Sequence, residues 1–287
     1  MAVAIAPGSC GELVQGVVDG RYFLVTCPVS WYSEVEIIPG KDGPALPHQR
    51  KLRQAVCTWL DKHGYAVEPF LVRVRSSLPR GKGMASSSAD IAAACVAAAA
   101  AKGCAITPQE IAALAVAIEP SDGIFFEGIV AFDHVAGAWC EMLGTPPPMT
   151  LAIFDTGGRV DTVRFNQRAD LQTLNRAKEA DVRRAFALVK EGLRTADPCL
   201  IGAGATLSAV DNQTILEKRG LEAAIACVSG HGAVGINAAH SGTVIGVLFD
   251  DKCLAGLPAC VRQLQREQAD WRYLGQAKLV SGGIFAQ

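Results

Sequence analysis

Apolar runs separated by turn residues make up the beginning of the chain. Their bounds are residues 3–6, 13–18, 22–26 and 29–38. Runs of this length predict successive short strands, and the Asp19-Gly20 pair is typical of a tight turn between antiparallel neighbours. Residues 70–76, which contain Leu71, Val72 and Val74, predict one more strand.

The first helix is predicted over residues 49–62, because apolar side chains recur there every three or four positions. The alanine-rich run 91–101 predicts a second helix and is shorter than the roughly 20 residues of a membrane span. A third helix is predicted after Thr107, which can cap it, with Pro108 at the first helical position and Glu110 at the third.

The rest of the chain mixes helices and strands again. Strands are predicted at 151–155, at 243–249 and near 277–281, and helices within 169–195, at 198–209, at 212–227 and near 254–268. The three prolines at 146–148 cannot continue a helix or an inner strand, so we predict a border between two domains there, 1–148 and 149–287. Helices and strands in both halves indicate an α+β fold.

The composition excludes several classes of protein. With 50% hydrophobic and 19% charged residues among 287, the chain can bury a substantial core. Lys and Arg total 27 against 28 Asp and Glu, which leaves no electrostatic footprint for nucleic acid. The first residues lack the basic region of a signal peptide, so we expect a cytoplasmic protein with no membrane partner.

The ten cysteines form no CxxC pair and no metal-ligand spacing. Most of them lie inside apolar runs. We therefore expect buried free thiols in a reducing compartment.

A loop rich in Gly and Ser, residues 79–90, connects the strand at 70–76 to the alanine-rich helix. Several backbone N–H groups and the positive end of a helix dipole meet in such a loop, and polyphosphate is its natural ligand. Lys82 adds a positive charge, although a loop of this composition can also be a flexible connector. The loop is not a Walker A motif, because Ser76 and Gly83 stand where Gly and Ser or Thr are required.

This Gly/Ser loop resembles the P-x-x-x-G-L-G-S-S-A-A motif of the GHMP kinases, a family that includes galactokinase, homoserine kinase and mevalonate kinase. Ala85 stands where the family usually has glycine, and Ser88 where it has alanine. Residues 6–16 (APGSCGELVQG) resemble the family's first motif, and residues 237–243 follow in the place of the third, with Ala-His-Ser replacing Gly-Ala-Gly. The three motifs occur in the family's order along nearly the whole chain.

The resemblance implies a two-lobed α+β fold with a ribosomal-S5-like nucleotide-binding N-terminal half and a ferredoxin-like C-terminal half. It implies ATP and Mg²⁺ as cofactors, with Ser87 and Glu119 as the metal ligands. The residues expected to bind the nucleotide are Pro79, Arg80, Gly81, Lys82, Gly83, Met84, Ala85, Ser86, Ser87, Ser88 and Ala89.

The resemblance further implies Asp122 as the base at the acceptor hydroxyl, and we expect Lys82 to be the second catalytic side chain. Asp133 is the alternative base, and Asp122-Gly123 can also be read as an ordinary turn. His231 and His240 are each more typical of an ordinary surface or loop histidine than of a catalytic one. Arg21 and Arg159 are the two candidates for holding a substrate carboxylate.

The first motif indicates which acceptor the chain uses. The expected acceptor-binding residues are Ser9, Glu12, Gln15, Asp122, His240 and Ser241. Glu12 can pair with an ammonium group, so a small-molecule amino-acid alcohol fits better than a sugar. The opening and the loop together resemble the family members that phosphorylate L-threonine for the aminopropanol linker of cobalamin. Phosphorylation of homoserine stays open as an alternative activity, and so does a role as an inert, ligand-binding member of the family. Assembly as a homodimer also stays open.

Overall fold

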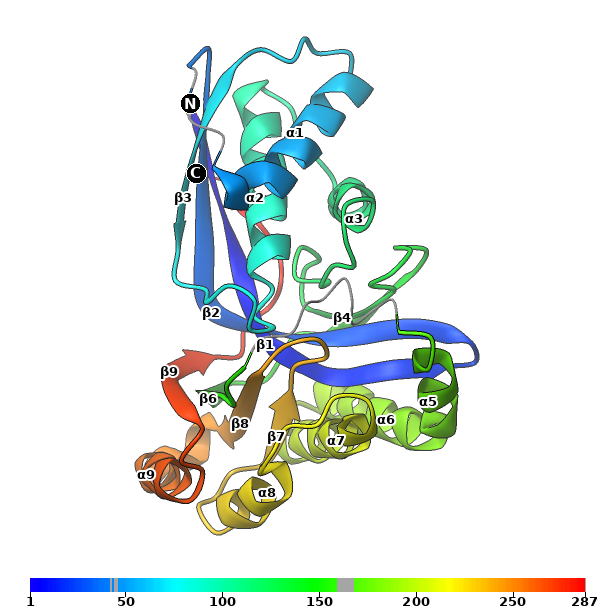
Figure 1. Cartoon of the computed structure of the whole chain (residues 1–287), viewed down its shortest axis with the longest axis vertical. Coiled ribbons are helices and arrows are strands. Elements are labelled where there is room, and N and C mark those ends of the chain that lie inside the picture. The colour runs from blue at the N-terminus through cyan, green and yellow to red at the C-terminus, as the bar shows by residue number, and fades with distance from the viewer. Residues whose placement is uncertain (42, 44–45, 159–167, 287) are drawn as a thin grey trace.

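The computed structural model describes residues 1–41, 43, 46–158 and 168–286. A ten-stranded sheet runs through two lobes in the order β5-β4-β2-β1-β7-β8-β6-β9, with β3 paired to β2 and β10 paired to β1. Figure 1 shows α1, α2, α3 and β3 in one lobe and α5 to α9 in the other. The mixed helices and antiparallel strands confirm the predicted α+β class.

Two long strands, β1 (Ala2–Val18) and β2 (Arg21–Pro39), replace the four short ones that the turn residues predicted. They form one antiparallel hairpin around Asp19 and Gly20, as the Asp-Gly pair predicted. The prediction of breaks inside the strands was wrong because β-bulges at Pro7/Gly8 and between Ser9 and Val14 absorb the irregular residues while the pairing continues.

The N-terminal lobe is built around α2 (Ser86–Ala101), which packs on β1, β2 and α1 (Arg50–Lys62). Its alanines at 92–94 and 97–99 are all buried, and their small size lets the helix lie close to the sheet on one side and to α1 on the other. The predicted strand β3 (Phe70–Ser76) is confirmed. So is α3 (Pro108–Val116), where the side chains of Thr107 and Glu110 form the expected capping box.

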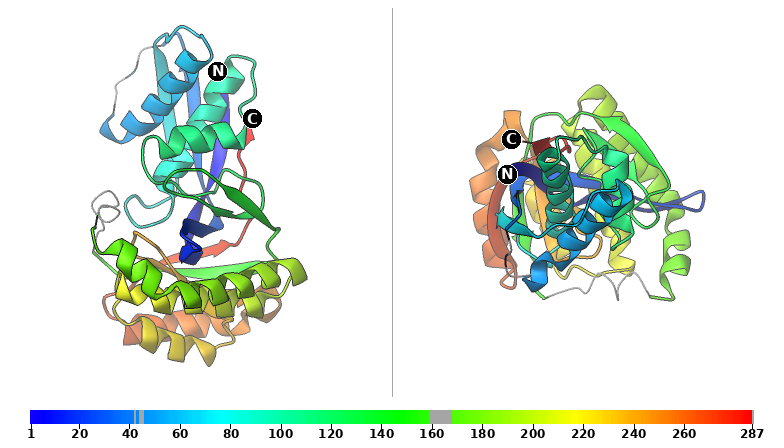
Figure 2. Two further views of the ribbon diagram at one scale, coloured as in Figure 1. Left: turned by 90° about the vertical axis from the view of Figure 1, so that its right-hand side faces the viewer. Right: turned by 90° about the horizontal axis from the view of Figure 1, so that it is seen from above.

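The C-terminal lobe places helices over one end of the sheet (Figure 2). Its strands are β6 (Met149–Asp155), β7 (Gly235–Ala238), β8 (Val244–Asp250) and β9 (Arg272–Lys278), and its helices are α5 (Leu171–Ala177), α6 (Glu179–Thr195), α7 (Pro198–Asp211), α8 (Leu221–Ser229) and α9 (Leu257–Glu267). Short 3-10 turns at Pro47–Gln49, Asn212–Thr214 and Asp251–Gly256 complete the helical segments. The last strand was predicted near 277–281 but begins at Arg272, and the helix predicted over 212–227 begins only at Leu221.

Four strands had no counterpart in the sequence prediction: β4 (Ile129–Phe132), β5 (Cys140–Gly144), β7 and β10 (Phe285–Ala286). The three prolines lie between β5 and β6. The β1–β2 hairpin packs against α2 on one side of this border, and β1 contacts α6 and α7 on the other. The division at residue 148 therefore stays a proposal.

All ten cysteines are free. The expected burial holds for Cys10, Cys27, Cys95 and Cys260, but it is wrong for four others that lie in loops, at a helix start or on an outer strand: Cys104, Cys140, Cys199 and Cys253. Among the described helices, none combines the length and the apolar character that crossing a membrane would take.

Candidate active site

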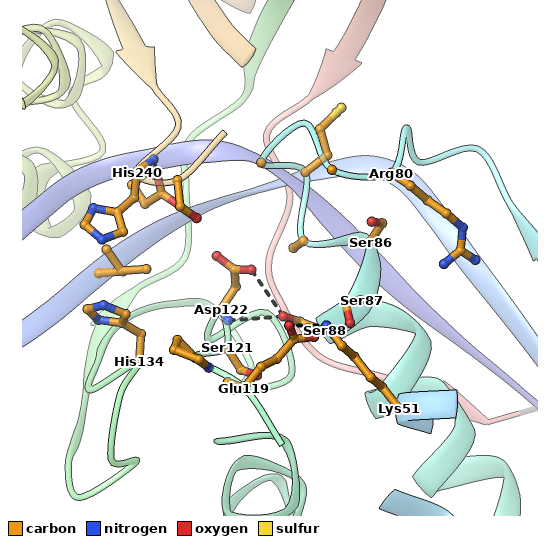
Figure 3. Close-up of a pocket in the computed structure, with 18 of the residues that line it drawn as sticks. Lys51, Arg80, Ser86, Ser87, Ser88, Glu119, Ser121, Asp122, His134 and His240 are labelled. Atoms are coloured by element: carbon orange, nitrogen blue, oxygen red, sulfur yellow. Dashed lines mark hydrogen bonds and ion pairs between the residues drawn. The ribbon is translucent and has the colours of Figure 1, made fainter. Parts of the chain in front are cut away.

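A cavity of about 770 Å³ opens between the Gly/Ser loop, the start of α1, the segment after α3 and the third motif. Figure 3 shows His134 and His240 on one side of it, Arg80 and Lys51 on the other, and Asp122 between them. The lining residues come from parts of the chain that are far apart in sequence, from Glu12 on β1 to Ser241.

The Gly/Ser loop is clamped between the first and the third motif. The amides of Ser9 and Gly11 donate to the carbonyls of Met84 and Gly83, each over 3.1 Å. On the other side, the amides of Thr243 and Val244 donate to the carbonyl of Lys82 over 2.8 and 3.0 Å. The three motifs therefore meet at one backbone junction and hold the loop as a defined surface rather than a flexible connector.

Two glycines make this junction possible. A Cβ on Gly242 would lie 2.4 Å from the Cα of Gly83, and Gly83 itself has a φ of +84°. Ala85, just before α2, is also left-handed, with a φ of 53°. That conformation explains why glycine is usual at the position of Ala85 in the motif.

Most of the loop residues predicted to bind the nucleotide face the cavity. Arg80, Gly81, Gly83, Met84, Ala85, Ser86, Ser87 and Ser88 line it, whereas Pro79, Lys82 and Ala89 are not part of its wall. The Lys82 ammonium points instead to the C-terminal lobe, where it pairs with Asp155 at 2.8 Å and donates to the carbonyl of Gly158 at 2.9 Å. A contact of Lys82 with phosphate stays a prediction.

Ser87 and Glu119, the expected metal pair, touch each other at the cavity wall. The Ser87 hydroxyl donates to one carboxylate oxygen of Glu119, and the ammonium of Lys51 donates to the other. Lys51 comes from the first turn of α1 and was not predicted to belong to the site. Among the described residues, no cluster of three or more His, Cys, Asp or Glu side chains could hold a metal by itself.

Asp122, the predicted base, is held by Ser88 at the start of α2. The Ser88 hydroxyl donates to the Asp122 carboxylate over 3.2 Å and accepts from the Asp122 amide over 3.3 Å. Burial, opposed by the Ser88 hydrogen bond and reinforced by the charge of Glu119, raises the pKa of Asp122 from 3.8 to about 6. Such a carboxyl is ionised near neutral pH but remains a usable proton acceptor.

The alternative base, Asp133, lies outside the cavity wall. Its carboxylate accepts hydrogen bonds from the amides of Val135, Ala136 and Ala138 over 3.0 to 3.1 Å. Asp133 therefore shapes the loop that follows β4, and the geometry favours Asp122 for chemistry.

Glu12 lines the cavity one residue after Gly11, whose amide donates to the carbonyl of Gly83 in the Gly/Ser loop. It is 4% exposed, and its carboxylate accepts a hydrogen bond from the amide of His240. Burial and the nearby charge of Asp122 raise the pKa of Glu12, whereas the His240 amide and the ammonium of Lys218 lower it. A cationic ligand would favour the ionised form in the same way as Lys218 does.

Two residues expected to bind the acceptor lie behind the cavity wall. Gln15 is fully buried, donates to the carbonyl of Ala238 over 3.1 Å and meets the Nδ1 atom of His240 at 2.9 Å. Ser9 is also fully buried and contributes its amide to the loop. Gln15 thus supports His240, and Ser9 supports Met84, which both line the cavity.

His134 and His240, whose ring centroids lie 5.3 Å apart, line the cavity together. Burial lowers the pKa of His134 to about 4 and that of His240 well below its ordinary value. Both rings are therefore neutral at physiological pH. His134 follows Asp133 in a loop and belongs to no motif, so no signal in the sequence indicated that this histidine lies in the site.

The remaining candidates lie elsewhere. Arg21 is exposed at the turn of the β1–β2 hairpin, and Arg159 lies outside the described residues. His231 contacts Gln263 at 2.7 Å and does not line the cavity.

Comparison with known proteins shows to which family the chain belongs. A model of the GHMP kinases N terminal domain matches residues 50–127. An L-threonine kinase of Salmonella typhimurium is 36% identical over 293 residues, which cover 100% of this chain and 96% of that protein. The chain belongs to the GHMP kinase family. A second GHMP kinase relative, the L-threonine kinase of Citrobacter freundii, is 35% identical over 254 residues, 87% of this chain and 87% of that protein.

The fold agrees with that of other GHMP kinases. A homoserine kinase from Cytophaga hutchinsonii superimposes with a TM-score of 0.72 at 14% identity and covers 100% of this chain and 97% of its own. At this identity the likeness shows a shared fold alone. As a GHMP kinase, the chain is an enzyme that uses ATP as the phosphate donor for a small molecule.

Proposed function

We propose that this GHMP kinase transfers the γ-phosphoryl group of ATP to the side-chain hydroxyl of L-threonine and releases O-phospho-L-threonine. The observation that carries the proposal is the 36% identity to an L-threonine kinase along the entire chain. The cavity supports it, because the carboxylates of Glu12 and Asp122 line it together with His134 and His240. The product, O-phospho-L-threonine, would supply the aminopropanol linker of cobalamin.

We assign the phosphates of ATP to the Gly/Ser loop, whose backbone faces the cavity at the start of α2. Arg80 lines this end, and its guanidinium is held by Asp90 at 2.9 Å. Lys82 can contribute only when its ammonium leaves Asp155. Phosphoryl transfer depends mainly on positioning and on charge stabilisation, which this end of the cavity provides.

Mg²⁺ fits the residues that are present. This ion prefers hard oxygen ligands and commonly takes one or two from the protein, with phosphates and waters supplying the rest. The adjacent hydroxyl of Ser87 and carboxylate of Glu119 form such a donor set, with Lys51 as a neighbouring charge. When bound there, the ion would neutralise charge on the phosphates.

Asp122 is the proposed base for the threonine hydroxyl. Its carboxylate lines the cavity, and Ser88 fixes its position from the start of α2. A pKa of about 6 keeps it ionised at neutral pH, so it can accept the hydroxyl proton as the new O–P bond forms. Glu12 is proposed to receive the ammonium group of threonine, beside His240 and Ser241.

We also propose that the protein is cytoplasmic, that it can form a homodimer, and that it divides into two domains at residue 148. The free state of all ten cysteines agrees with a reducing compartment.

The deciding experiment is an acceptor screen with the purified protein, ATP and Mg²⁺, with products identified by mass and ³¹P NMR. We expect L-threonine first and serine lower by roughly 10- to 200-fold for the missing methyl contact. Homoserine should be poor because its hydroxyl lies one methylene farther out, and sugars should be inactive. Homoserine as the best acceptor would replace the proposal, and ATP binding without any product would indicate an inert family member.

A further inference from the structure

Lys82 lies between two glycines of the Gly/Ser loop and is held both at its carbonyl and at its ammonium group. Gly81 and Gly83 have φ angles of 69° and 84°, and both line the cavity. Lys82 itself is not part of the wall that the described residues form. Glycines on both sides of one residue leave the backbone many conformations, so the shape of the loop depends on its contacts with the rest of the protein.

The C-terminal lobe supplies the contacts of Lys82. The Lys82 carbonyl accepts from the amides of Thr243 and Val244, at the start of β8, over 2.8 and 3.0 Å. The Lys82 ammonium pairs with the carboxylate of Asp155, the last residue of β6, at 2.8 Å and donates to the carbonyl of Gly158 at 2.9 Å. Asp155 and Val244 are partners in the β6–β8 register, so the backbone and the side chain of Lys82 reach the same end of the sheet.

Asp155 connects the Gly/Ser loop with the third motif. It is 6% exposed, and its other carboxylate oxygen accepts from the Thr243 hydroxyl at 2.6 Å and from the Gly157 amide at 3.1 Å. Burial raises the pKa of Asp155, but its hydrogen bonds, that from Lys82 first among them, bring this pKa below its ordinary value. The carboxylate is therefore ionised at neutral pH and holds Lys82 and Thr243 at the same time.

The contacts favour a Lys82 that stays on Asp155. If the ammonium moved to the phosphates, it would leave a buried carboxylate without its counter-ion, which is strongly unfavourable. The loop can bind phosphates without it, because the backbones of Gly81 and Gly83 line the cavity just before α2. The position of these backbone groups is what the contacts of Lys82 fix.

We propose that Asp155 is a positioning residue of the nucleotide site, which holds Lys82 and Thr243 from the C-terminal lobe and so keeps the Gly/Ser loop in the shape that receives the phosphates of ATP. This inference rests on the proposed assignment of the phosphates to that loop. It adds a functional residue outside the three motifs, and it makes Lys82 act on ATP through Asp155 instead of by direct contact.

The test is a double-mutant cycle with Asp155→Asn, Lys82→Met and the double variant, with the Kd for ATP measured by calorimetry in the presence of Mg²⁺ and without an acceptor. Asp251→Asn is the matched control. Asp251 pairs with Lys278 at 2.6 Å and accepts from the Thr150 hydroxyl at 2.5 Å, so the same three side-chain types meet at the opposite end of β6.

We expect Asp155→Asn and Lys82→Met each to raise the Kd for ATP about tenfold, and the double variant to be no worse, because all three lose the same contact. The KM for threonine should stay at its wild-type value. Lys82→Arg keeps the charge and should recover part of the ATP affinity. Asp251→Asn should lower the free energy of unfolding but bind ATP as the wild type does.

Thr243→Val is a second route to the same answer if Asp155→Asn does not fold. It removes the hydroxyl bonded to Asp155 and leaves the ion pair with Lys82 in place. Weaker ATP binding in Thr243→Val would support the positioning role, and wild-type binding would contradict it.

Three results would overturn the proposal. Unchanged or tighter ATP binding in Asp155→Asn, with a loss in Lys82→Met, would mean that Lys82 contacts the phosphates and that Asp155 competes for it. Losses that add up in the double variant would show two independent effects. An equal loss of ATP affinity in Asp251→Asn would reduce the effect to general stability. A wild-type protein that binds no ATP would instead refute the proposed nucleotide site itself.

Discussion

The substitution Asp122→Asn should make the protein more stable while it removes catalysis. The Asp122 carboxylate is enclosed by the cavity wall and lies near the carboxylates of Glu119 and Glu12, and its pKa is raised from 3.8 to about 6. A carboxyl whose pKa is raised by folding destabilises the folded state wherever it is ionised. Asparagine keeps the shape and can still accept the hydrogen bond from Ser88.

The size of the effect follows from the pKa. A change of one pKa unit corresponds to 1.36 kcal/mol, so raising the pKa of Asp122 from 3.8 to about 6 costs about 3 kcal/mol above pH 6. The cost falls as the pH drops from 6 to 3.8 and vanishes well below pH 3.8, where the carboxyl is protonated in both the folded and the unfolded protein. The stability gain of Asp122→Asn should therefore be about 3 kcal/mol at pH 8 and about 0.5 kcal/mol at pH 4.

Urea unfolding of the wild type and the variant at both pH values measures this gain. Turnover with threonine should fall by roughly 10² or more, the contribution of a general base. Asp133→Asn is the control, because its carboxylate accepts three backbone hydrogen bonds, and it should lose stability and keep kcat. The reasoning fails if Asp122→Asn is no more stable than the wild type at pH 8, or if Asp133→Asn alone abolishes turnover.

Two further substitutions test the Gly/Ser loop. Ser87→Ala should lower kcat at least tenfold and raise the Mg²⁺ concentration needed for half-maximal activity, with an unchanged circular dichroism spectrum, because it removes the hydroxyl beside Glu119; an unchanged rate would remove the metal assignment. Ala85→Gly should raise the free energy of unfolding, measured in urea, by about 1 kcal/mol, because an alanine in the left-handed conformation is strained. Ala196→Gly is the matched control, since Ala196 has the same φ of 53° at an exposed helix end. A gain at Ala196 without one at Ala85 would mean that the loop tolerates alanine.

The sequence pattern correctly predicted those helices and strands whose own residues determine their structure. The helix predicted over 49–62 is observed at Arg50–Lys62, and the strand at 70–76 has the predicted bounds. The pattern failed for β1 because a bulged strand can pass through Pro7-Gly8 when its partner β2 supplies the pairing. It also failed for short strands such as β4, whose four residues are defined by their neighbours in the sheet.

The residues of the candidate site also fall into a group that the sequence predicted and a group that it did not. A contiguous motif predicted the Gly/Ser loop, and the resemblance to the GHMP kinases added Ser87, Glu119 and Asp122, which do gather around one cavity. Lys51 could not be predicted, because it lies in a segment without a motif and reaches the site only through the tertiary fold.

The strand β1 sets the distance between the donor and acceptor ends of the cavity. The amide of Gly11 holds the loop through the carbonyl of Gly83 at 3.1 Å, and the next residue, Glu12, presents the carboxylate proposed to bind the acceptor ammonium. The Gly/Ser loop and the proposed ammonium-binding carboxylate are thus fixed to consecutive residues of one buried strand. An acceptor must span this distance with the atoms between its nitrogen and its hydroxyl, and a displacement of about 1 Å can cost about 10²-fold in rate. Threonine has two carbons in that path and homoserine has three, so a rigid strand would distinguish two isomers that carry the same functional groups.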